Sequence, residues 1–345
     1  MVQTDSNSSK PGAGAEGPPP AWEAIVVQAR PFLARVSQGL AAQVELFEPE
    51  IAGYARYALS SQGKQIRPAL VALAGGVVRP ASDDLVTLAV IIEMVHLATL
   101  VHDDIMDEAA IRRRRPTMAA RWGNEVSVLL GDCLFAQALK LASSFPTPEI
   151  CRRVSSASGT VCTGEILQNQ RRRNWKVSRG DYFRIIGMKT AELFALACSA
   201  AAYQSGGEIA TEKALHEYGF SLGTAYQIYD DCLDLYGVEN DAGKSLGTDL
   251  ASGKVTLPLL HFFTHATETE RNQTIQWLEN WQPSHFADVR NMVENYDALA
   301  ESCLVIGDFL NTARNALSKL KPGPEVEALK KLTEFLAQQT SALGV

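Results

Sequence analysis

The chain has 345 residues, of which 46% are hydrophobic and 21% are charged, and its formal net charge at pH 7 is −7. This length and composition predict one large domain with a sizeable core, and the negative charge argues against a general nucleic-acid-binding protein. The cysteines are scattered without a CxxC pair. We therefore expect free thiols in a reducing compartment.

Residues 1–21 are rich in Ser, Gly, Pro and Ala and contain no apolar segment of the kind found in a signal peptide. This composition predicts a disordered tail, and the lack of an export signal predicts a cytoplasmic protein. From residue 22 to residue 345 the apolar residues recur at helical spacing almost throughout. We therefore expect a single all-α domain.

The apolar periodicity, interrupted by Gly and Pro, sets the expected helix bounds. They are 22–44 with a kink at Pro31, 47–60, 66–78, 83–107, 124–144, 148–173, 179–205, 208–236, 255–265, 268–280, 284–296, 298–319 and 323–341.

An apolar run over residues 85–101 leads into an acidic helix end that contains Asp103, Asp104 and Asp107. A glutamate and a histidine interrupt the run, so it predicts a buried core helix and not a membrane span. Asp103 and Asp107 lie one helical turn apart on one face, so both carboxylates can reach one cation. A single DDxxD would also fit a solvated acidic end.

The same spacing occurs again, where residues 220–229 lead into Asp230, Asp231 and Asp234. If the two acidic ends face each other, their carboxylates form a cage. Hard oxygen ligands without a nearby Cys or His set favour Mg²⁺, which takes its remaining ligands from water and substrate phosphates. We therefore expect a magnesium site.

Basic residues lie close to both acidic ends in the sequence. Lys64 and Arg67 open a helix and can hold an anion there, although two ordinary surface cations would give the same pattern. His96 precedes the first acidic end by two turns, where a satisfied core histidine is the common alternative. Residues 112–115 are four arginines that fit a diphosphate, whereas residues 171–173 are expected to be solvent-exposed and without function.

The second half of the chain contains a similar set of polar residues. Lys189 and Thr190 lie inside an apolar helix, where a free ammonium is costly unless it meets an anion. Gln227 shares a helix face with the second acidic end. Lys244 and Lys254 lie in a glycine-rich stretch that can close over phosphates as a lid.

Taken in order, these fragments resemble the trans-isoprenyl diphosphate synthases, the polyprenyl synthetase family, from about residue 63 to residue 258. The resemblance implies the isoprenoid synthase fold, a single bundle of long helices around a deep apolar cavity with the two aspartate-rich ends opposed at its mouth. The matching motifs are GKQIRP, HDDIMD, RRRRPT, GEILQ, KTAELF, YQIYDDCLD and GKSLGTDLASGK.

The resemblance also implies roles for the matching residues. About three Mg²⁺ ions would be bound by Asp103, Asp107 and Asp230, with support from Asp104, Asp231 and Asp234. The allylic diphosphate would contact Arg112, Lys189 and Lys254. Isopentenyl diphosphate would bind at Lys64, Arg67, His96 and Arg113. The lid would include Lys244 and Asp249, and oxygen dipoles would reach the allylic cation from Thr190 and Gln227.

The implied activity is the head-to-tail condensation of isopentenyl diphosphate with an allylic prenyl diphosphate. The expected enzyme is a homodimer that binds no nucleic acid and releases its product through transient contact with a membrane surface. The alternatives are a short-chain farnesyl or geranylgeranyl diphosphate synthase, a class I terpene cyclase and a non-catalytic subunit. The second intact aspartate cluster argues against the last two.

Product length is expected to depend on the helix wall below Asp103. Thr99 and Ala98 stand fourth and fifth before Asp103, where short-chain relatives carry an aromatic residue. Because an isoprene unit is about as long as one helical turn, roughly 5 Å, an open wall predicts a product of roughly C30 to C50. Ala98→Phe or Ala98→Tyr is expected to shorten it, and Phe135 on the neighbouring helix is a candidate later stop.

Overall fold

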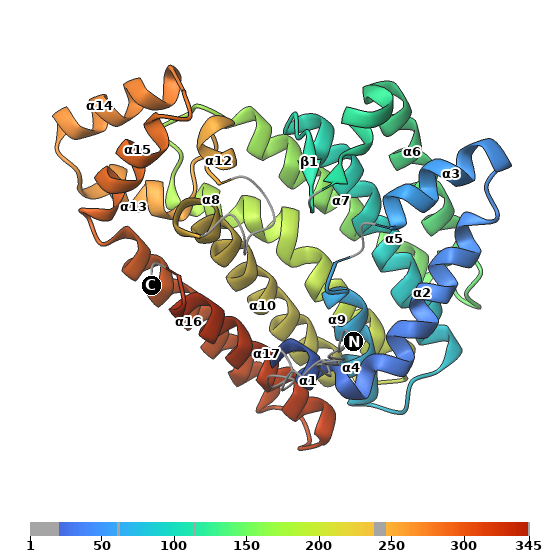
Figure 1. The fold of residues 1–345 in the computed structure, drawn as a ribbon. Helices are drawn as coiled ribbons and strands as arrows, with labels where there is room; N and C mark the ends of the chain where they lie inside the picture. The colour runs from blue at the N-terminus through green and yellow to red at the C-terminus, as the bar shows by residue number, and fades with distance from the viewer. Residues whose placement is uncertain (1–20, 61–62, 114, 238–245, 344–345) are drawn as a thin grey trace, which may run out of the picture.

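The structure is a computed structural model, and it describes residues 21–60, 63–113, 115–237 and 246–343 (Figure 1). The predicted lid residue Lys244 lies outside these ranges, as does nearly all of the predicted tail. The expected all-α fold is confirmed. Within the described residues the strands are confined to a two-stranded hairpin of β1 (Ile111–Arg112) and β2 (Arg115–Pro116).

The helices follow the predicted order closely. Their bounds are α1 Ala21–Val26, η1 Val27–Ala29, α2 Arg30–Val44, α3 Pro49–Leu59, α4 Ile66–Gly76, α5 Asp83–Met106, α6 Met118–Ala142, α7 Glu149–Gln170, α8 Arg179–Ile186, η2 Gly187–Ala191, α9 Glu192–Gln204, α10 Ile209–Tyr236, α12 Thr248–Ala251, α13 Leu257–His265, α14 Glu268–Glu279, α15 His285–Glu294, α16 Ala298–Leu317 and α17 Pro324–Ser341.

The first helix differs from the prediction because it is broken before Pro31. The 3₁₀ segment η1 separates α1 from α2, and Pro31 lies in the first turn of α2. Its missing N–H needs no partner there, so the proline starts a helix and does not kink one.

Helix α6 begins six residues before its predicted start, at Met118 and not at 124. The Thr117 hydroxyl caps it by accepting a hydrogen bond from the Ala120 N–H at 3.1 Å, as an N-cap threonine does. Gly123 has φ +85° inside the helix. This non-helical residue kinks α6 and divides it into a short first segment and a longer one that begins at residue 124, the predicted start.

Helix α9 lies between α5 and α10 in the bundle (Figure 1). Helix α5 packs against α6, α4, α2 and α9, and α10 packs against α9 and α16. Close contact between α9 and α10 depends on Gly219 and Gly223. A Cβ at these positions would lie 2.5 Å from the Phe194 carbonyl oxygen and 2.7 Å from the Ala191 Cα. The two glycines thus let the backbones of α9 and α10 approach each other closely, in the part of α10 that precedes its polar residues.

Two helical stretches, Asp83–Met106 and Arg179–Gln204, are long and apolar enough to cross a membrane by length and composition. Within the fold, 72% and 83% of their most apolar windows are buried. Both are therefore core elements of the bundle, as expected for the first. Helix α5 begins at the Ser82 cap, whose hydroxyl accepts from the Leu85 N–H, and it ends at the first aspartate cluster.

Candidate active site

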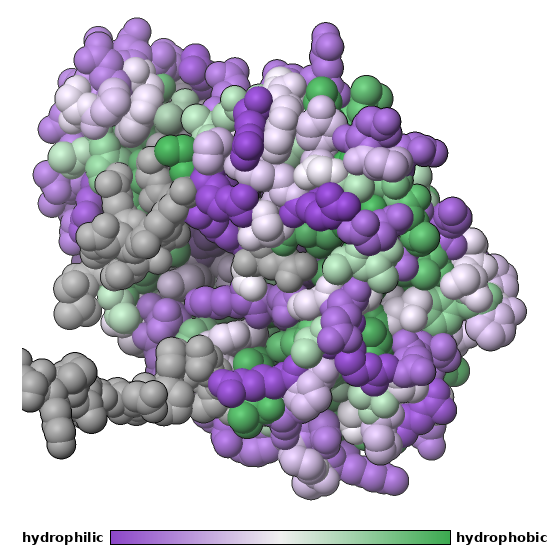
Figure 2. Space-filling model, turned by 45° about the vertical axis from the view of Figure 1, so that its right-hand side comes forward, coloured by the Kyte–Doolittle hydropathy of each residue, from purple (hydrophilic) through white to green (hydrophobic). Residues whose placement is uncertain are grey.

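A cavity of about 1540 Å³ opens where the C-terminal ends of α5, α7 and α10 meet. It exceeds the roughly 300–1,000 Å³ of a typical small-ligand site. Figure 2 shows hydrophilic side chains around a hollow near the middle of one face of the molecule. Asp103, Asp107 and Asp230 all line the cavity. The structure therefore brings both aspartate clusters to one site, although they lie far apart in the sequence.

The aspartates of the first cluster differ in environment. Asp104 does not line the cavity; it is buried and accepts a hydrogen bond from Arg112 Nε at 2.7 Å. Asp103 lines the cavity. Burial raises the pKa of the Asp103 carboxyl to about 6, and the nearby Glu165 and Asp107 add to the effect against the opposing influence of Lys189. An uncompensated negative charge of this kind is what a bound cation would relieve.

Asp107 accepts hydrogen bonds from two protein cations. Arg172 Nη2 donates to Asp107 Oδ1 at 2.6 Å, and Lys254 Nζ donates to Oδ2 at 3.0 Å. Although burial alone would raise it, the pKa of Asp107 is lowered, chiefly by Lys254 and Lys189. Asp107 is therefore ionised, with both of its oxygens already bound by protein cations.

The second cluster is likewise divided between the cavity and the protein interior. Asp231 accepts from the Tyr182 hydroxyl at 2.7 Å and from Gln227 Nε2 at 2.8 Å. Burial and the nearby Asp249 raise the pKa of Asp231 to about 8. Asp234 accepts from the Thr248 hydroxyl and from the Asp249 N–H and so anchors α12. Only Asp230 and Asp231 of this cluster line the cavity.

The six carboxylates of the two clusters do not converge on one point in the described structure. Across the described ranges, no three Asp, Glu, His or Cys side chains come close enough together to hold one metal ion. Asp104 and Asp234 are instead bound to Arg112 and to α12, because each lies on a side of its helix that faces protein. Asp103, Asp107 and Asp230 still present hard oxygen donors to one cavity. This donor set fits divalent cations that take part of their coordination from a substrate.

Lys189 forms an ion pair, as expected for an ammonium group inside an apolar helix. Its Nζ lies 2.6 Å from Glu165 Oε2 and donates to Gln168 Oε1 at 2.8 Å. Lys189 belongs to η2, a π-helical turn, and such turns are frequent at functional sites. Gly164 lets α7 pack closely against η2, because a Cβ at this position would lie 2.7 Å from the backbone nitrogen of Lys189.

A chain of hydrogen bonds runs from η2 into α10. The Thr190 hydroxyl donates to Gln227 Oε1 at 2.6 Å, and Gln227 Nε2 donates in turn to Asp231. Thr190, Gln227 and Asp231 all line the cavity. Gln227 is therefore fixed in orientation, and the lone pairs of the Thr190 hydroxyl remain available.

Arg67 on α4 is half-buried and lines the cavity. Its guanidinium stacks over the Phe194 ring at 4.8 Å, and Nε has no hydrogen-bond partner among the described residues. Burial lowers the pKa of Arg67, while Glu93 opposes the change. Burial, together with Arg67 and Arg113, holds the pKa of His96 well below its usual range, so His96 is neutral. Glu93, which we did not predict, is the nearby buried carboxyl.

Lys64 and Arg113 complete this side of the cavity. Lys64 Nζ lies 5.5 Å from the centre of the Phe335 ring on α17. Gly63 allows the β1–β2 hairpin to come close, because a Cβ there would lie 2.4 Å from the Arg113 guanidinium. Lys64, Arg67, His96 and Arg113 all line the cavity, and Arg67 and Arg113 lie close enough to His96 to lower its pKa.

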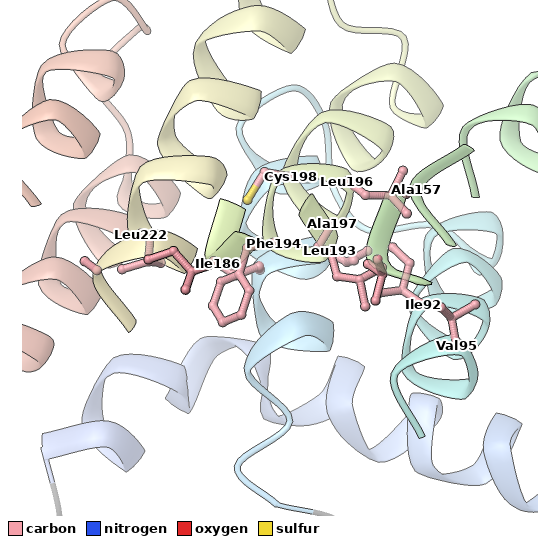
Figure 3. Close-up of a cluster of buried hydrophobic side chains, with 14 of the residues drawn as sticks. Ile92, Val95, Ala157, Ile186, Leu193, Phe194, Leu196, Ala197, Cys198 and Leu222 are labelled. Atoms are coloured by element: carbon pink, nitrogen blue, oxygen red, sulfur yellow. The ribbon is translucent and has the colours of Figure 1, made fainter. Parts of the chain in front are cut away.

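The wall predicted to set chain length needs a correction. Thr99 and Phe135 line the cavity, whereas Ala98 is fully buried and does not. Successive helix residues lie about 100° apart, so Ala98 faces packed neighbours when Thr99 faces the cavity. Ile92 and Val95, which lie further from Asp103 along α5, belong to the packed core (Figure 3). Further from Asp103 than Thr99, the α5 side chains that line the cavity are His96 and Glu93.

Residues 171–173 also require a correction, because they are not simple surface cations. Arg171 pairs with Asp181 at 3.2 Å, and Arg172 pairs with Asp107. The Arg173 N–H donates to the Gly253 carbonyl at 2.7 Å, with Arg173 at φ +58°. Helix α7 ends at Gln170, so the three arginines form a turn that folds back toward the cavity. Only the tertiary fold brings this turn to the acids, and no sequence signal marks it.

The comparisons with known proteins agree with this geometry. The sequence model described as Polyprenyl synthetase matches residues 48–296. Octaprenyl diphosphate synthase of Haemophilus influenzae is 39% identical over 237 residues, which cover 69% of this chain and 72% of that protein. A short chain isoprenyl diphosphate synthase of Methanothermobacter thermautotrophicus is 32% identical over 285 residues, covering 81% of this chain and 88% of the relative.

A solved structure shares the whole bundle. Polyprenyl synthase from Caulobacter crescentus, in a complex with calcium and isoprenyl diphosphate, superposes with a TM-score of 0.88 at 31% identity. The match covers 92% of this chain and 97% of that one.

Proposed function

The chain belongs to the polyprenyl synthetase family, and on that basis we propose that it is a trans-prenyltransferase that makes a long-chain polyprenyl diphosphate. It condenses isopentenyl diphosphate with an allylic prenyl diphosphate, head to tail. The observation that carries the proposal is the convergence of Asp103, Asp107 and Asp230 with Lys189 and Lys254 on one large cavity.

The proposed cofactor is Mg²⁺, about three ions per site, held by Asp103, Asp107 and Asp230. The bound ions would supply positive charge against the negative charge that grows on the departing diphosphate. The calcium in the Caulobacter crescentus structure supports a divalent cation in such a site. Asp104, Asp231 and Asp234 would position the cluster through Arg112, through Tyr182 and Gln227, and through α12, respectively.

Three cations of the chain would bind the allylic diphosphate. Each is paired with a carboxylate here: Arg112 with Asp104, Lys189 with Glu165 and Lys254 with Asp107. These contacts hold the cations at the cavity before the substrate arrives. Preorganised charge of this kind costs little reorganisation when the diphosphate leaves.

Isopentenyl diphosphate would bind at Lys64, Arg67, His96 and Arg113. Arg67 Nε is buried and has no hydrogen-bond partner among the described residues. Because an unsatisfied buried donor is costly, an anion bound beside Arg67 would relieve that cost. A neutral His96 can donate a hydrogen bond without adding charge.

The double bond of isopentenyl diphosphate then attacks the allylic cation, and a proton is lost, in our proposal to the departed diphosphate. The Thr190 hydroxyl donates a hydrogen bond to Gln227, so the lone pairs of its oxygen can face the cation. Lys244 and Asp249 would belong to a lid that excludes water from the cation.

The relatives differ in the length of the product that their names give. The octaprenyl relative supports a long chain, roughly C30 to C50 by the turn-by-turn estimate. The second candidate is a short-chain synthase, supported by the Methanothermobacter thermautotrophicus relative and by the position of Ala98, which is packed in the core and does not line the cavity. Phe135 would then act with Thr99 at the end of the cavity.

The experiment that tests the reaction class measures diphosphate release from farnesyl diphosphate with Mg²⁺, with and without isopentenyl diphosphate. A synthase releases diphosphate rapidly only with the second substrate and forms one new carbon–carbon bond per release. A terpene cyclase would release it without isopentenyl diphosphate, and a non-catalytic subunit would release none. Either result would overturn the proposal.

The setting of the enzyme belongs to the same proposal. We expect a homodimer, because exposed apolar side chains such as Leu129 on α6 and Ile166 on α7 would be covered by a second copy. We place it in the cytoplasm, with transient contact between the cavity mouth and a membrane surface during release of an apolar product.

A further inference from the structure

Arg172 lies in the turn after α7, and its guanidinium reaches the cavity mouth. Nη2 donates to Asp107 Oδ1 at 2.6 Å, and Nη1 donates to the Met106 carbonyl at 3.1 Å. The side chain is only 20% exposed. Its Nε is buried and has no hydrogen-bond partner in the described part of the chain. Arg172 is thus fixed over the last turn of α5 with one donor unused.

The contact between Arg172 and Asp107 uses a carboxylate oxygen to which a metal ion would have to bind. A divalent cation that uses Asp107 Oδ1 must come within about 2–2.6 Å of that oxygen. The Arg172 guanidinium already occupies this approach at 2.6 Å, and Lys254 occupies the other oxygen at 3.0 Å. Because like charges at such distances repel strongly, an ion bound to Asp107 weakens both contacts and favours the loss of one of them.

Arg172 is the side chain that is easier to displace. Lys254 is also held by Asp249 at 3.3 Å, and its side chain is 12% exposed. Among the described residues, Arg172 pairs with no carboxylate other than Asp107, and its second hydrogen bond goes to the Met106 carbonyl. The backbone beside it is tied down by the hydrogen bond from the Arg173 N–H to the Gly253 carbonyl. A movement of Arg172 would therefore be confined to its side chain.

We propose that Arg172 is a positioning residue that holds Asp107 in the metal-free site and yields Oδ1 to the divalent cation. The inference rests on the proposed function, since it takes Asp107 as a metal ligand. Metal binding to the substrate-free protein is weakened by the fraction of molecules in which Arg172 still holds Asp107. An incoming diphosphate offers the released guanidinium a new anion, so metal and diphosphate favour each other's binding.

A purely structural ion pair makes a different prediction. If the contact between Arg172 and Asp107 only ties the turn to α5, removal of Arg172 loosens the turn without improving metal affinity. The affinity of the substrate-free protein for a metal ion therefore separates the two roles.

The test uses Mn²⁺ as a paramagnetic substitute for Mg²⁺ and measures free Mn²⁺ by electron paramagnetic resonance with the full chain and no substrate. Arg172→Gln should lower the Kd for Mn²⁺ about tenfold relative to the wild type. Arg171→Gln is the matched control, because it removes the same charge one residue away but pairs with Asp181. Arg172→Lys keeps the charge and loses the planar guanidinium, so its affinity for Mn²⁺ should lie between those of Arg172→Gln and Arg171→Gln.

A double-mutant cycle assigns the effect to Asp107. In an Asp107→Asn background, which itself should bind Mn²⁺ more weakly, Arg172→Gln should give no further gain in affinity. The inference is overturned if Arg172→Gln binds Mn²⁺ no more tightly than Arg171→Gln, or if its gain persists beside Asp107→Asn. Circular dichroism of each variant confirms that the helices are intact.

The same data separate this inference from the proposed function. If the wild type binds Mn²⁺ through Asp107 but Arg172→Gln binds equally, only the role of Arg172 fails. If neither the wild type nor Arg172→Gln binds Mn²⁺, even with inorganic diphosphate added, both the role of Arg172 and the metal ligands of the proposed function fail.

Discussion

The Lys189 ammonium lies 2.6 Å from Glu165 Oε2, deep in the wall of the cavity. The two side chains come from η2 and α7 and are both largely buried. Glu165 therefore stands in for the diphosphate that we assign to Lys189, and the site keeps its cations in place by pairing them internally.

Lys189→Met should raise KM for the allylic substrate and lower kcat, because a cation that meets the leaving diphosphate is lost. It should also destabilise the fold by roughly 3 kcal/mol, since Glu165 is left buried without its partner. Adding Glu165→Leu should restore much of the stability but none of the activity. Thermal unfolding and steady-state kinetics on both variants check this, and recovery of activity in the double variant would contradict the role of Lys189.

Asp103→Asn should abolish most of the turnover while leaving the helical circular dichroism intact. Without metal the variant should be more stable than the wild type at neutral pH. The folded-state pKa of Asp103 is raised to about 6, so the stability that this group contributes is full below its unfolded value near pH 4 and is lost as the pH rises through about 6.

The expected difference at pH 7 is about 2–3 kcal/mol, and it should vanish near pH 4. Urea unfolding of the metal-free wild type and Asp103→Asn at several pH values measures it. A constant difference between the two proteins from pH 4 to pH 7 would refute the raised pKa.

Arg67→Lys should mainly raise KM for isopentenyl diphosphate, by about tenfold or more, because an ammonium cannot replace the planar fork of the guanidinium. Lys254→Ala is the matched comparison and should mainly affect the allylic substrate. Initial rates with each substrate varied in turn give both constants. Equal changes for both substrates in both variants would mean that the two diphosphate sites are not separate.

Thr99→Phe should shorten the product, since the ring would enter the cavity just below Asp103 without touching the aspartates. Diphosphate release in the first condensation should continue, because the metal ligands are unchanged. Ala98→Phe serves as the comparison. Ala98 is fully buried in the core, so a ring there should lower stability by about 1–3 kcal/mol through overpacking.

Chromatography of the dephosphorylated products measures both variants. An unchanged product length in Thr99→Phe, or a shorter product in Ala98→Phe alone, would show that the wall is set at Ala98, as the sequence suggested, and not at Thr99.

Much of the fold could be predicted from the sequence because its signals are local. The apolar run of α5, its Ser82 cap and its acidic end are contiguous, so the helix was predicted to within a residue of its observed end. The same holds for α10, in which spacing alone places Asp230 and Asp234 one turn apart. The kink expected at Pro31 was wrong because a proline in the first turn is equally compatible with a new helix.

The site could be predicted only where residue types carry the chemistry by themselves. Two aspartate clusters and isolated cations in apolar helices point to a metal and a phosphate wherever they lie. The pairing of Arg172 with Asp107, the burial of Glu93 near Arg67 and the partners of Asp104 and Asp234 depend on which helix face meets which neighbour. These facings follow from packing between segments far apart in the chain, and no local pattern encodes them.

The most direct measurement is the product of the wild-type chain incubated with Mg²⁺, farnesyl diphosphate and excess isopentenyl diphosphate, resolved by chain length. The long-chain relatives predict a polyprenyl diphosphate of roughly C30 to C50, formed only when Mg²⁺ and both substrates are present. A product that stops at farnesyl or geranylgeranyl diphosphate would contradict the long-chain assignment, and unchanged substrates would contradict the enzyme itself.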